Sequence, residues 1–326
     1  MYEDAPFNYL VDYAFVNGLT ENPKYSQVLG LNAGGDKIFY YQYGPTDTCA
    51  EAFSASPLHL ENTKFPTVGP QALNLSTRGK IGSGEDALIA GFIVSGTESK
   101  KVALRVLGPS LRNSGLTGTL ANPVLTLYNS AGSVIATDDD WQSDPGAAEL
   151  TANGLAPGDP VEAATVQTLA PGSYTMVATG KEFGSGIGLV EVYDLSPESV
   201  SKLANISTRG AVGTADDVLI SGFIVGDVAN ATVVIRSLGP SLTAFGVSDP
   251  LTNPTLTVYD ANGVGIATNN DWQDDVNAFD ISKNALAPSD PVEAATILYL
   301  PAGSYTTIVS GADGGSGVAL VEVYDL

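Results

Sequence analysis

The chain has 326 residues, of which 44% are hydrophobic, 36 are Gly and 19 are Pro, a composition typical of a folded, turn-rich β protein. Its 36 acidic and 14 basic residues give a formal net charge of −22, which argues against the basic surface that nucleic-acid binding or docking on an anionic membrane requires. No apolar run reaches the roughly 18 residues of a membrane span, and the single cysteine, Cys49, excludes an intrachain disulfide.

Residues 1–70 form an aromatic-rich N-terminal segment with 12 of the 24 Phe and Tyr residues. The stretches 9–16 and 37–43 are predicted strands. The segment has three interpretations: a small β domain, packing on the next domain, or donation of a strand to a neighbouring molecule. Assembly would then use the aromatic residues Phe7, Tyr9, Tyr13 and Phe15.

The two ends of the chain lack the pattern of a complete precursor. The opening MYEDAPF has no secretory signal pattern, and the chain stops on a predicted strand, VEVYDL. We therefore expect a processed product or a piece of a longer parent.

The rest of the chain is an internal duplication. Residues 74–195 (copy 1) and 205–326 (copy 2) align at a constant offset of 131 without insertion or deletion. NLSTRG in copy 1 aligns with NISTRG in copy 2, and GFIV, LGPSL, GSYT and VEVYDL recur unchanged. A duplication of this length predicts two copies of one folded unit. The expected domains are residues 71–195 and 205–326, joined by a short polar linker at 196–204.

Each copy consists of short predicted strands between Gly, Pro, Asn and Asp turns. In copy 1 we expect strands at 73–78, 87–94, 101–107, 123–129, 133–137, 161–169, 173–180 and 186–193. One short helix is expected within 142–153. The pattern predicts an all-β fold of two tandem antiparallel β-sandwich or jelly-roll domains.

The sequence contains no recognisable catalytic constellation, so we expect a protein that is not an enzyme. The one histidine, His59, lies outside the duplication. Ser110 and Ser241 of the two LGPSL strings therefore have no histidine in their own copy to activate them. No GxSxG motif is present.

Acids and arginines recur at equivalent positions, and we expect them to form structural ion pairs across strands. A glycosidase-type carboxylate pair is the alternative interpretation. The expected partners are Arg78, Arg105, Glu162 and Glu191 in copy 1 and Arg209, Arg236, Glu293 and Glu322 in copy 2.

One acidic turn is a candidate Ca²⁺ site, the only cofactor that the sequence suggests. Asp138, Asp139 and Asp140 precede Trp141, and Asp271 precedes Trp272 in copy 2. Oxygen ligands in a tight turn suit Ca²⁺, although the EF-hand spacing is absent. The alternative is a turn in which Asp and Asn side chains bond the backbone.

Two further surface interactions concern sugars. Trp141 and Trp272 are candidate stacking platforms for a glycan, or else cap the core edge. Three sequons, at Asn74, Asn205 and Asn230, are candidate glycosylation sites.

Several strings of copy 2 occur together and in order: LANISTRG, VLISGFIV, VIRSLGPSL, NPTLTVYDANG, LAPSDPVEAAT, LPAGSYTTIVSG and GVALVEVYDL. In these strings the duplication resembles a domain of secreted proteins from Verrucomicrobia and related bacteria. The TLTVYDANG…GSYTTIVSG portion is also similar to bacterial pre-peptidase C-terminal domains. The resemblance covers both copies and none of residues 1–70. It implies an exported, non-catalytic β-sandwich and carries over no catalytic residue.

The expected function is that of a structural protein, extracellular or on the cell surface, that assembles with copies of itself into a filament or surface layer. The alternative is a Ca²⁺-dependent carbohydrate-binding or adhesion module with polysaccharide as its partner. Neither nucleic-acid binding nor membrane insertion is expected.

Overall fold

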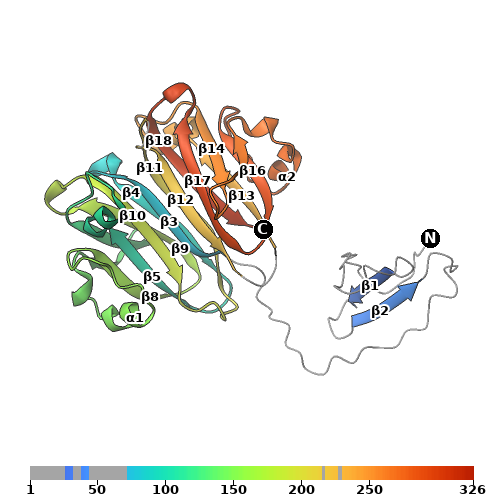
Figure 1. Cartoon of the computed structure of the whole chain (residues 1–326), viewed down its shortest axis with the longest axis horizontal. Coiled ribbons are helices and arrows are strands. Elements are labelled where there is room, and N and C mark those ends of the chain that lie inside the picture. The colour runs from blue at the N-terminus through green and yellow to red at the C-terminus, as the bar shows by residue number, and fades with distance from the viewer. Residues whose placement is uncertain (1–25, 32–37, 44–71, 215–216, 227–229) are drawn as a thin grey trace. The chain divides into compact units, whose positions relative to one another are not determined.

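The computed structural model describes residues 26–31, 38–43, 72–214, 217–226 and 230–326 (Figure 1). Contacts divide the chain into two units, Met1–Thr67 and Val68–Leu326. In the first unit, β1 (Ser26–Leu31) and β2 (Ile38–Tyr43) pair antiparallel, with Leu29 opposite Tyr40. The strand expected at 37–43 is thereby confirmed, whereas the one expected at 9–16 lies outside the described residues.

The duplication sets the elements of the second unit. Copy 1 comprises β3 (Ala72–Ile81), β4 (Leu88–Ser95), β5 (Lys100–Leu107), β6 (Pro123–Asn129), β7 (Val134–Asp138), α1 (Ala147–Ala152), β8 (Ala163–Leu169), β9 (Gly172–Gly180) and β10 (Gly186–Asp194). Copy 2 repeats them as β11 (Lys202–Val212), β12 (Leu219–Val225), β13 (Ala231–Leu238), β14 (Pro254–Tyr259), β15 (Gly265–Asn269), α2 (Ala278–Lys283), β16 (Ala294–Leu300), β17 (Gly303–Gly311) and β18 (Gly317–Asp325). Every strand predicted for copy 1 is present within a few residues, and the all-β class is confirmed.

The strands form because apolar side chains alternate with partly exposed ones, so that one face of each strand is buried. In β12, residues 219, 221, 223 and 225 are buried and the residues between them are half-exposed. A 3₁₀ turn, η2 (Pro109–Ser114), follows β5, and η5 (Pro240–Phe245) follows β13. Each begins with a proline, which is accommodated at the first position of a helix. Among the described residues no helix is long and apolar enough to cross a membrane.

The first strand of each copy is shared with the other copy. β3 pairs with β10 of its own copy and with β12 of copy 2, whereas β11 pairs with β18 of its own copy and with β4 of copy 1. In Figure 1, β3 and β11 lie in the middle of the unit. Each sheet therefore runs through both copies, and their orders are β7-β6-β9-β4-β11-β18-β13-β16 and β15-β14-β17-β12-β3-β10-β5-β8.

Equivalent residues of the two copies meet where β3 and β11 approach each other. The hydroxyls of Thr77 and Thr208, 131 positions apart, lie 2.8 Å from each other, and Thr77 is also 3.1 Å from the hydroxyl of Ser221. One backbone bridge, Ala211 opposite Lys80, joins the two sheets. Because Thr77 and Thr208 are equivalent residues, their contact shows that the two copies meet at β3 and β11.

The principal core also spans both copies. It contains Phe92 and Leu104, from different sheets of copy 1, together with Leu219 and Val321 of copy 2. A second cluster, around Phe223, belongs to copy 2 alone. The structure therefore does not confirm two separate sandwiches, because strand exchange places residues of copy 2 in the core of copy 1.

The linker expected at 196–204 is part of this unit. β11 already begins at Lys202, and the preceding residues bond to copy 1. The amide of Lys101 donates to Ser196 Oγ at 3.0 Å, and Ser201 Oγ donates to the carbonyl of Glu98 at 2.8 Å. The short polar segment is thus held against copy 1.

Candidate functional site

One polar cluster of copy 1 joins two neighbouring strands, β5 and β10. Glu191 on β10 lies directly opposite Arg105 on β5, and Arg105 Nε donates to Glu191 Oε2 at 2.8 Å. A second guanidinium nitrogen donates to the carbonyl of Leu155 at 2.7 Å, and Tyr193 donates its hydroxyl to Glu191 Oε1 at 2.7 Å. The guanidinium also lies over the Tyr193 ring, 5.1 Å from its centre.

Copy 2 repeats this cluster group for group. Arg236 bonds Glu322, donates to the carbonyl of Leu286 at 2.8 Å and lies 5.1 Å from the ring centre of Tyr324. Burial, with the neighbouring glutamate second, raises the pKa of each tyrosine to about 12, so the phenol stays protonated and donates. These are the ion pairs that the sequence predicted for Arg105, Glu191, Arg236 and Glu322, and they brace the loop after each helix against the sheet.

Arg78 and Arg209 do not form the predicted ion pairs within the described part of the chain. Both lie on the central strands, where each residue has a neighbour on two sides. Arg78 is opposite Leu189 and Ile220, and Arg209 is opposite Leu320 and Ile89. No acid occupies the facing positions, so the prediction was wrong for this pair of arginines.

Glu162 and Glu293 also have partners other than arginine. The side chain of Glu162 is fully buried, and its Oε1 accepts from the amides of Gly108 and Ser110 at 2.8 and 2.9 Å and from Ser110 Oγ at 2.6 Å. Glu293 makes the same three bonds to Gly239 and Ser241. The first amides of a helical turn have no partner within it, and this explains why the carboxylate is held there. Each repeated LGPSL string is therefore a turn bound by a buried glutamate.

The acidic turn before Trp141 distributes its carboxylates among separate partners. Asp138 Oδ2 accepts from the amide of Ala164 at 2.8 Å, and Asp139 pairs with Lys181 at 2.7 Å. In the described chain no group of three or more Asp, Glu, His or Cys residues could hold a metal ion. Asp138, Asp139, Asp140 and Asp271 thus receive no support from the geometry as Ca²⁺ ligands. Asp138 accepts from a backbone amide on β8, 26 positions away, and not from one within its own turn.

The two tryptophans are half-buried. Trp141 Nε1 donates to the carbonyl of Asp159 at 3.2 Å, and its ring packs with Leu150, Ala103 and Ala164 between α1 and the sheet. Trp272 occupies the equivalent place at the start of a 3₁₀ turn. The packing of Trp141 gives it a structural role, and glycan stacking stays a prediction.

Two of the three sequons are inaccessible. Asn74 and Asn205 lie on the central strands β3 and β11 and are only 5% and 8% exposed. A glycan needs an exposed amide, so the predicted modification of these two residues was wrong, whereas Asn230 is exposed. His59, Cys49 and the predicted assembly residues Phe7, Tyr9, Tyr13 and Phe15 all lie outside the described residues.

Asp138 allows a test of the pH dependence of folding. Burial, reinforced by nearby Asp144, raises its pKa from 3.8 to about 6 against the opposing bond from Ala164. Between these pH values the folded protein holds the proton more tightly than the unfolded chain does, so this group's contribution to the free energy of unfolding falls as the pH rises. In copy 2, Asn269 accepts from the amide of Ala295 at 3.0 Å in the same way.

As the pH rises, ionisation of Asp138 should lower the free energy of unfolding by about 3 kcal/mol, which corresponds to its raised pKa. We expect Asp138→Asn to remove this loss. Chemical denaturation of the wild type and the variant at pH 4 and pH 7 measures the difference. The free energy of unfolding of the variant should increase relative to that of the wild type as the pH rises. A difference between the two proteins that does not change with pH would contradict the assignment.

Sequence reasoning missed a cavity at one end of copy 2 and a set of exposed apolar side chains. The exposed residues include Val276, Phe279 and Tyr299, which are 94%, 79% and 68% exposed. Copy 1 has Pro145, Ala148 and Thr168 at these positions. Comparison of the two copies is a signal that could have identified this difference, since at these three positions copy 2 has the larger apolar residue.

No protein-family model and no curated protein matches this chain. Among solved structures, a DUF4785 family protein from Legionella pneumophila is 8% identical, with 79% of this chain and 89% of that chain covered and a TM-score of 0.19. Oxalate decarboxylase from Bacillus subtilis is 10% identical, with 77% and 69% covered and a TM-score of 0.14. Likenesses as weak as these carry no argument about fold or function.

Proposed function

We propose that the protein is an extracellular structural component that assembles with further copies of itself through copy 2. The observation that carries the proposal is the α2 surface, defined as Val276, Phe279 and Tyr299. Asn277 beside it bonds the carbonyl of Ile297 at 3.5 Å, which places the start of α2 against β16. Large exposed apolar groups on adjoining elements are typical of an interaction surface.

The edge of the sheet supports the same interpretation. Among the described strands, β16 pairs with β13 alone and β15 with β14 alone. The outer backbone groups of such end strands are available to another strand. β16 also carries Tyr299, so an apolar surface and an open edge lie together on copy 2.

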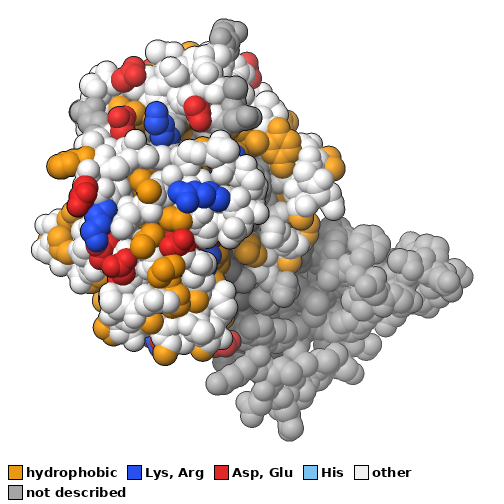
Figure 2. All heavy atoms as spheres, turned by 60° about the vertical axis from the view of Figure 1, so that its left-hand side comes forward, with side chains coloured by type: hydrophobic (Ala, Val, Ile, Leu, Met, Phe, Trp, Pro, Cys, Tyr) orange, Lys and Arg blue, Asp and Glu red, His pale blue; other side chains and the backbone are white. Residues whose placement is uncertain are grey.

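Copy 1 offers a different surface at the equivalent place. Figure 2 brings forward the side that carries α1 and β8, where hydrophobic side chains stand in small groups among charged and polar ones. The proposal requires that the α2 surface contacts a different surface of the next molecule, because unlike contacts that do not close produce a filament, whereas pairing of two α2 surfaces would stop at a dimer. Burial of each large apolar side chain contributes about 1.5–3 kcal/mol to such a contact.

The test is a charge placed on the α2 surface. We expect Phe279→Asp to abolish large species in sedimentation velocity and negative-stain microscopy, whereas the wild type forms them as its concentration rises. The fold should persist, because the side chain is 79% exposed and lies in the first turn of α2, where an acid is tolerated.

Ala148→Asp is the matched control at the equivalent position of α1. It should assemble like the wild type. A wild type that stays monomeric, or a Phe279→Asp variant that assembles unchanged, would refute the proposal.

A further inference from the structure

The apolar interior of copy 2 is divided in two, whereas that of copy 1 is continuous. On the copy 2 side, Leu219 and Val309 belong to the principal core that both copies share. Phe223 and Tyr305 belong to the second cluster, which we call the outer cluster. In copy 1 the counterparts of its members all lie in or against the principal core, apart from Lys100 at the position of Ala231.

A layer of hydroxyl groups separates the two clusters of copy 2. The hydroxyl layer consists of Ser221, Ser237 and Thr307, whose side chains are at most 1% exposed. At these positions copy 1 has apolar residues of the principal core, namely Ala90, Val106 and Met176. The interruption of the core is therefore particular to copy 2.

Strand pairing places the hydroxyl layer at one level of the two sheets. In one sheet, Thr307 lies opposite Ser221, which in turn lies opposite Thr77. In the other sheet, Ser237 and Thr208 lie opposite the same residue of β18. The two rows meet where the hydroxyls of Thr77 and Thr208 are 2.8 Å apart. The layer thus extends the polar contact at the centre of the unit into copy 2.

Two of the three hydroxyls lack a partner. Ser221 Oγ lies 3.1 Å from Thr77 Oγ1, but Ser237 Oγ and Thr307 Oγ1 are buried without a hydrogen-bond partner in the described structure. A buried polar group without a partner raises the free energy of the folded state. Water can bond both hydroxyls once the outer cluster separates from the layer, so their hydration favours this separation.

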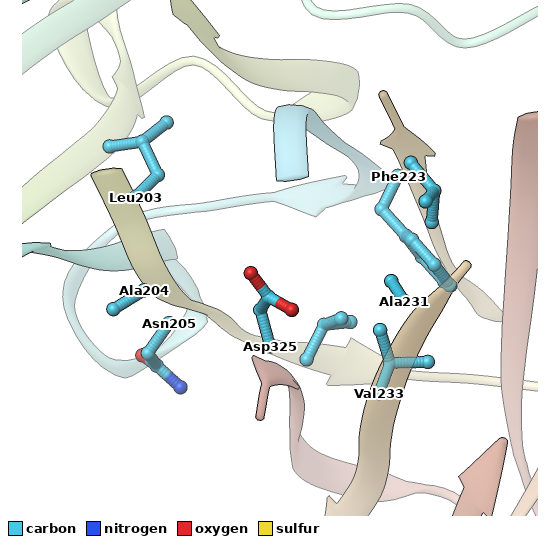
Figure 3. A pocket seen from close by; sticks show the side chains of 9 residues that line it. Leu203, Ala204, Asn205, Phe223, Ala231, Val233 and Asp325 are labelled. Atoms are coloured by element: carbon cyan, nitrogen blue, oxygen red, sulfur yellow. The ribbon is translucent and has the colours of Figure 1, made fainter. Parts of the chain in front are cut away.

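The far end of the outer cluster is also incompletely filled. Phe223, Ala231 and Val233 border a cavity of about 10 Å³ (Figure 3). Side chains that line a void have no contact partners on that side. At the position of Ala231, copy 1 has the long side chain of Lys100, which is completely buried. The outer cluster is therefore bounded by hydroxyls on one side and by a gap on the other.

We propose that the outer part of copy 2 opens and closes while the rest of the unit stays folded. This outer part comprises residues 222–225 of β12, 231–235 of β13 and 303–306 of β17. In the open form the hydroxyl layer is exposed to water, and the principal core stays packed. The open form is a minor population, so that heat still unfolds the unit in a single transition. Regions that rearrange on binding are drawn from such parts of low local stability, which makes the outer part the place where copy 2 can change conformation.

The test is amide hydrogen exchange of the full chain at rising low concentrations of urea. We expect the amides of the outer part to exchange faster than the inner amides, at 207–210 of β11 and 318–321 of β18. Exchange of the outer amides should also depend less on urea, because their opening exposes only part of the surface that complete unfolding exposes.

A double variant, Ser237→Ala with Thr307→Val, removes the two unpaired hydroxyls without adding volume. It stabilises the folded form against both the open form and the unfolded chain, because water bonds the hydroxyls in each of these. Exchange of the outer and of the inner amides should therefore slow by the same factor, about 10- to 100-fold.

Val212→Ala is the matched control in the principal core. Val212 is 1% exposed and belongs to the part that stays packed in the open form. This change should speed exchange of the inner amides and leave the outer amides unchanged. The proposal is overturned if the wild type exchanges its outer and inner amides at the same rate and with the same urea dependence. Unchanged outer exchange in the double variant, or equal acceleration of both sets by Val212→Ala, would overturn it as well.

Discussion

Copy 2 produced alone, as residues 196–326, is expected to give no folded monomer. Its first strand, β11, would lose its partner β4, and β12 would lose its partner β3. Leu203, Val212 and Leu219 would lose the core that they share with copy 1. Two long strand edges and a broad apolar surface would then be exposed, a combination that promotes pairing with another chain.

The expected product is a dimer of copy 2 in which the exchange takes place between two chains. Such a dimer is plausible on physical grounds, because β3 and β11 have nearly the same sequence, as do β4 and β12. Sedimentation velocity with circular dichroism distinguishes a dimer from a monomer. The whole chain should show one calorimetric transition for residues 68–326, which form one unit. A monomeric copy 2 that unfolds sharply by itself would contradict the shared-core interpretation.

The second large effect is expected from Lys100→Ala. This change removes the ammonium from a fully buried Asp194 and from the carbonyls of Ser196 and Ser201. Removal of one partner of a buried pair leaves a charge without compensation, which typically costs about 3–5 kcal/mol. Denaturation with urea should therefore show a much lower midpoint, and the 195–201 segment should exchange its amide hydrogens faster.

Lys101→Ala is the matched control on the adjacent residue of β5. Lys101 pairs with Glu149 at 2.9 Å, but the two side chains are 41% and 39% exposed. Exposed pairs of this kind contribute about 0.2–1 kcal/mol. Equal losses of stability in the two variants would show that the buried Lys100 pair contributes no more than the exposed Lys101 pair.

The sequence predicted individual contacts where the deciding information was local. The sequence predicted that Glu191 pairs with an arginine across strands, because it is a charge among apolar residues, but the choice of Arg105 over Arg78 came from the pairing of β10 with β5. The prediction failed for Glu162, because its partners are backbone amides of the turn after β5. Every residue except proline has a backbone amide, so no pattern of residue types indicated this acceptor role. The role of Asp138 was not predicted for the same reason. Its replacement by Asn269 in copy 2 does indicate that the position needs an acceptor and not a charge.

By itself the sequence determined the duplication, the order and bounds of the strands, and the all-β class, because alternation and turn residues act over a few positions. Which copy supplies the neighbour of each first strand was decided only in the tertiary structure. GFIV occurs in both β4 and β12, so β3 and β11 find equivalent partners within their own copy or across it. Local patterns are equally satisfied by both arrangements, and only the packing of the joined core selects between them. The pair of Lys100 and Asp194 likewise depends on that packing, because both side chains become buried only when the chain encloses them.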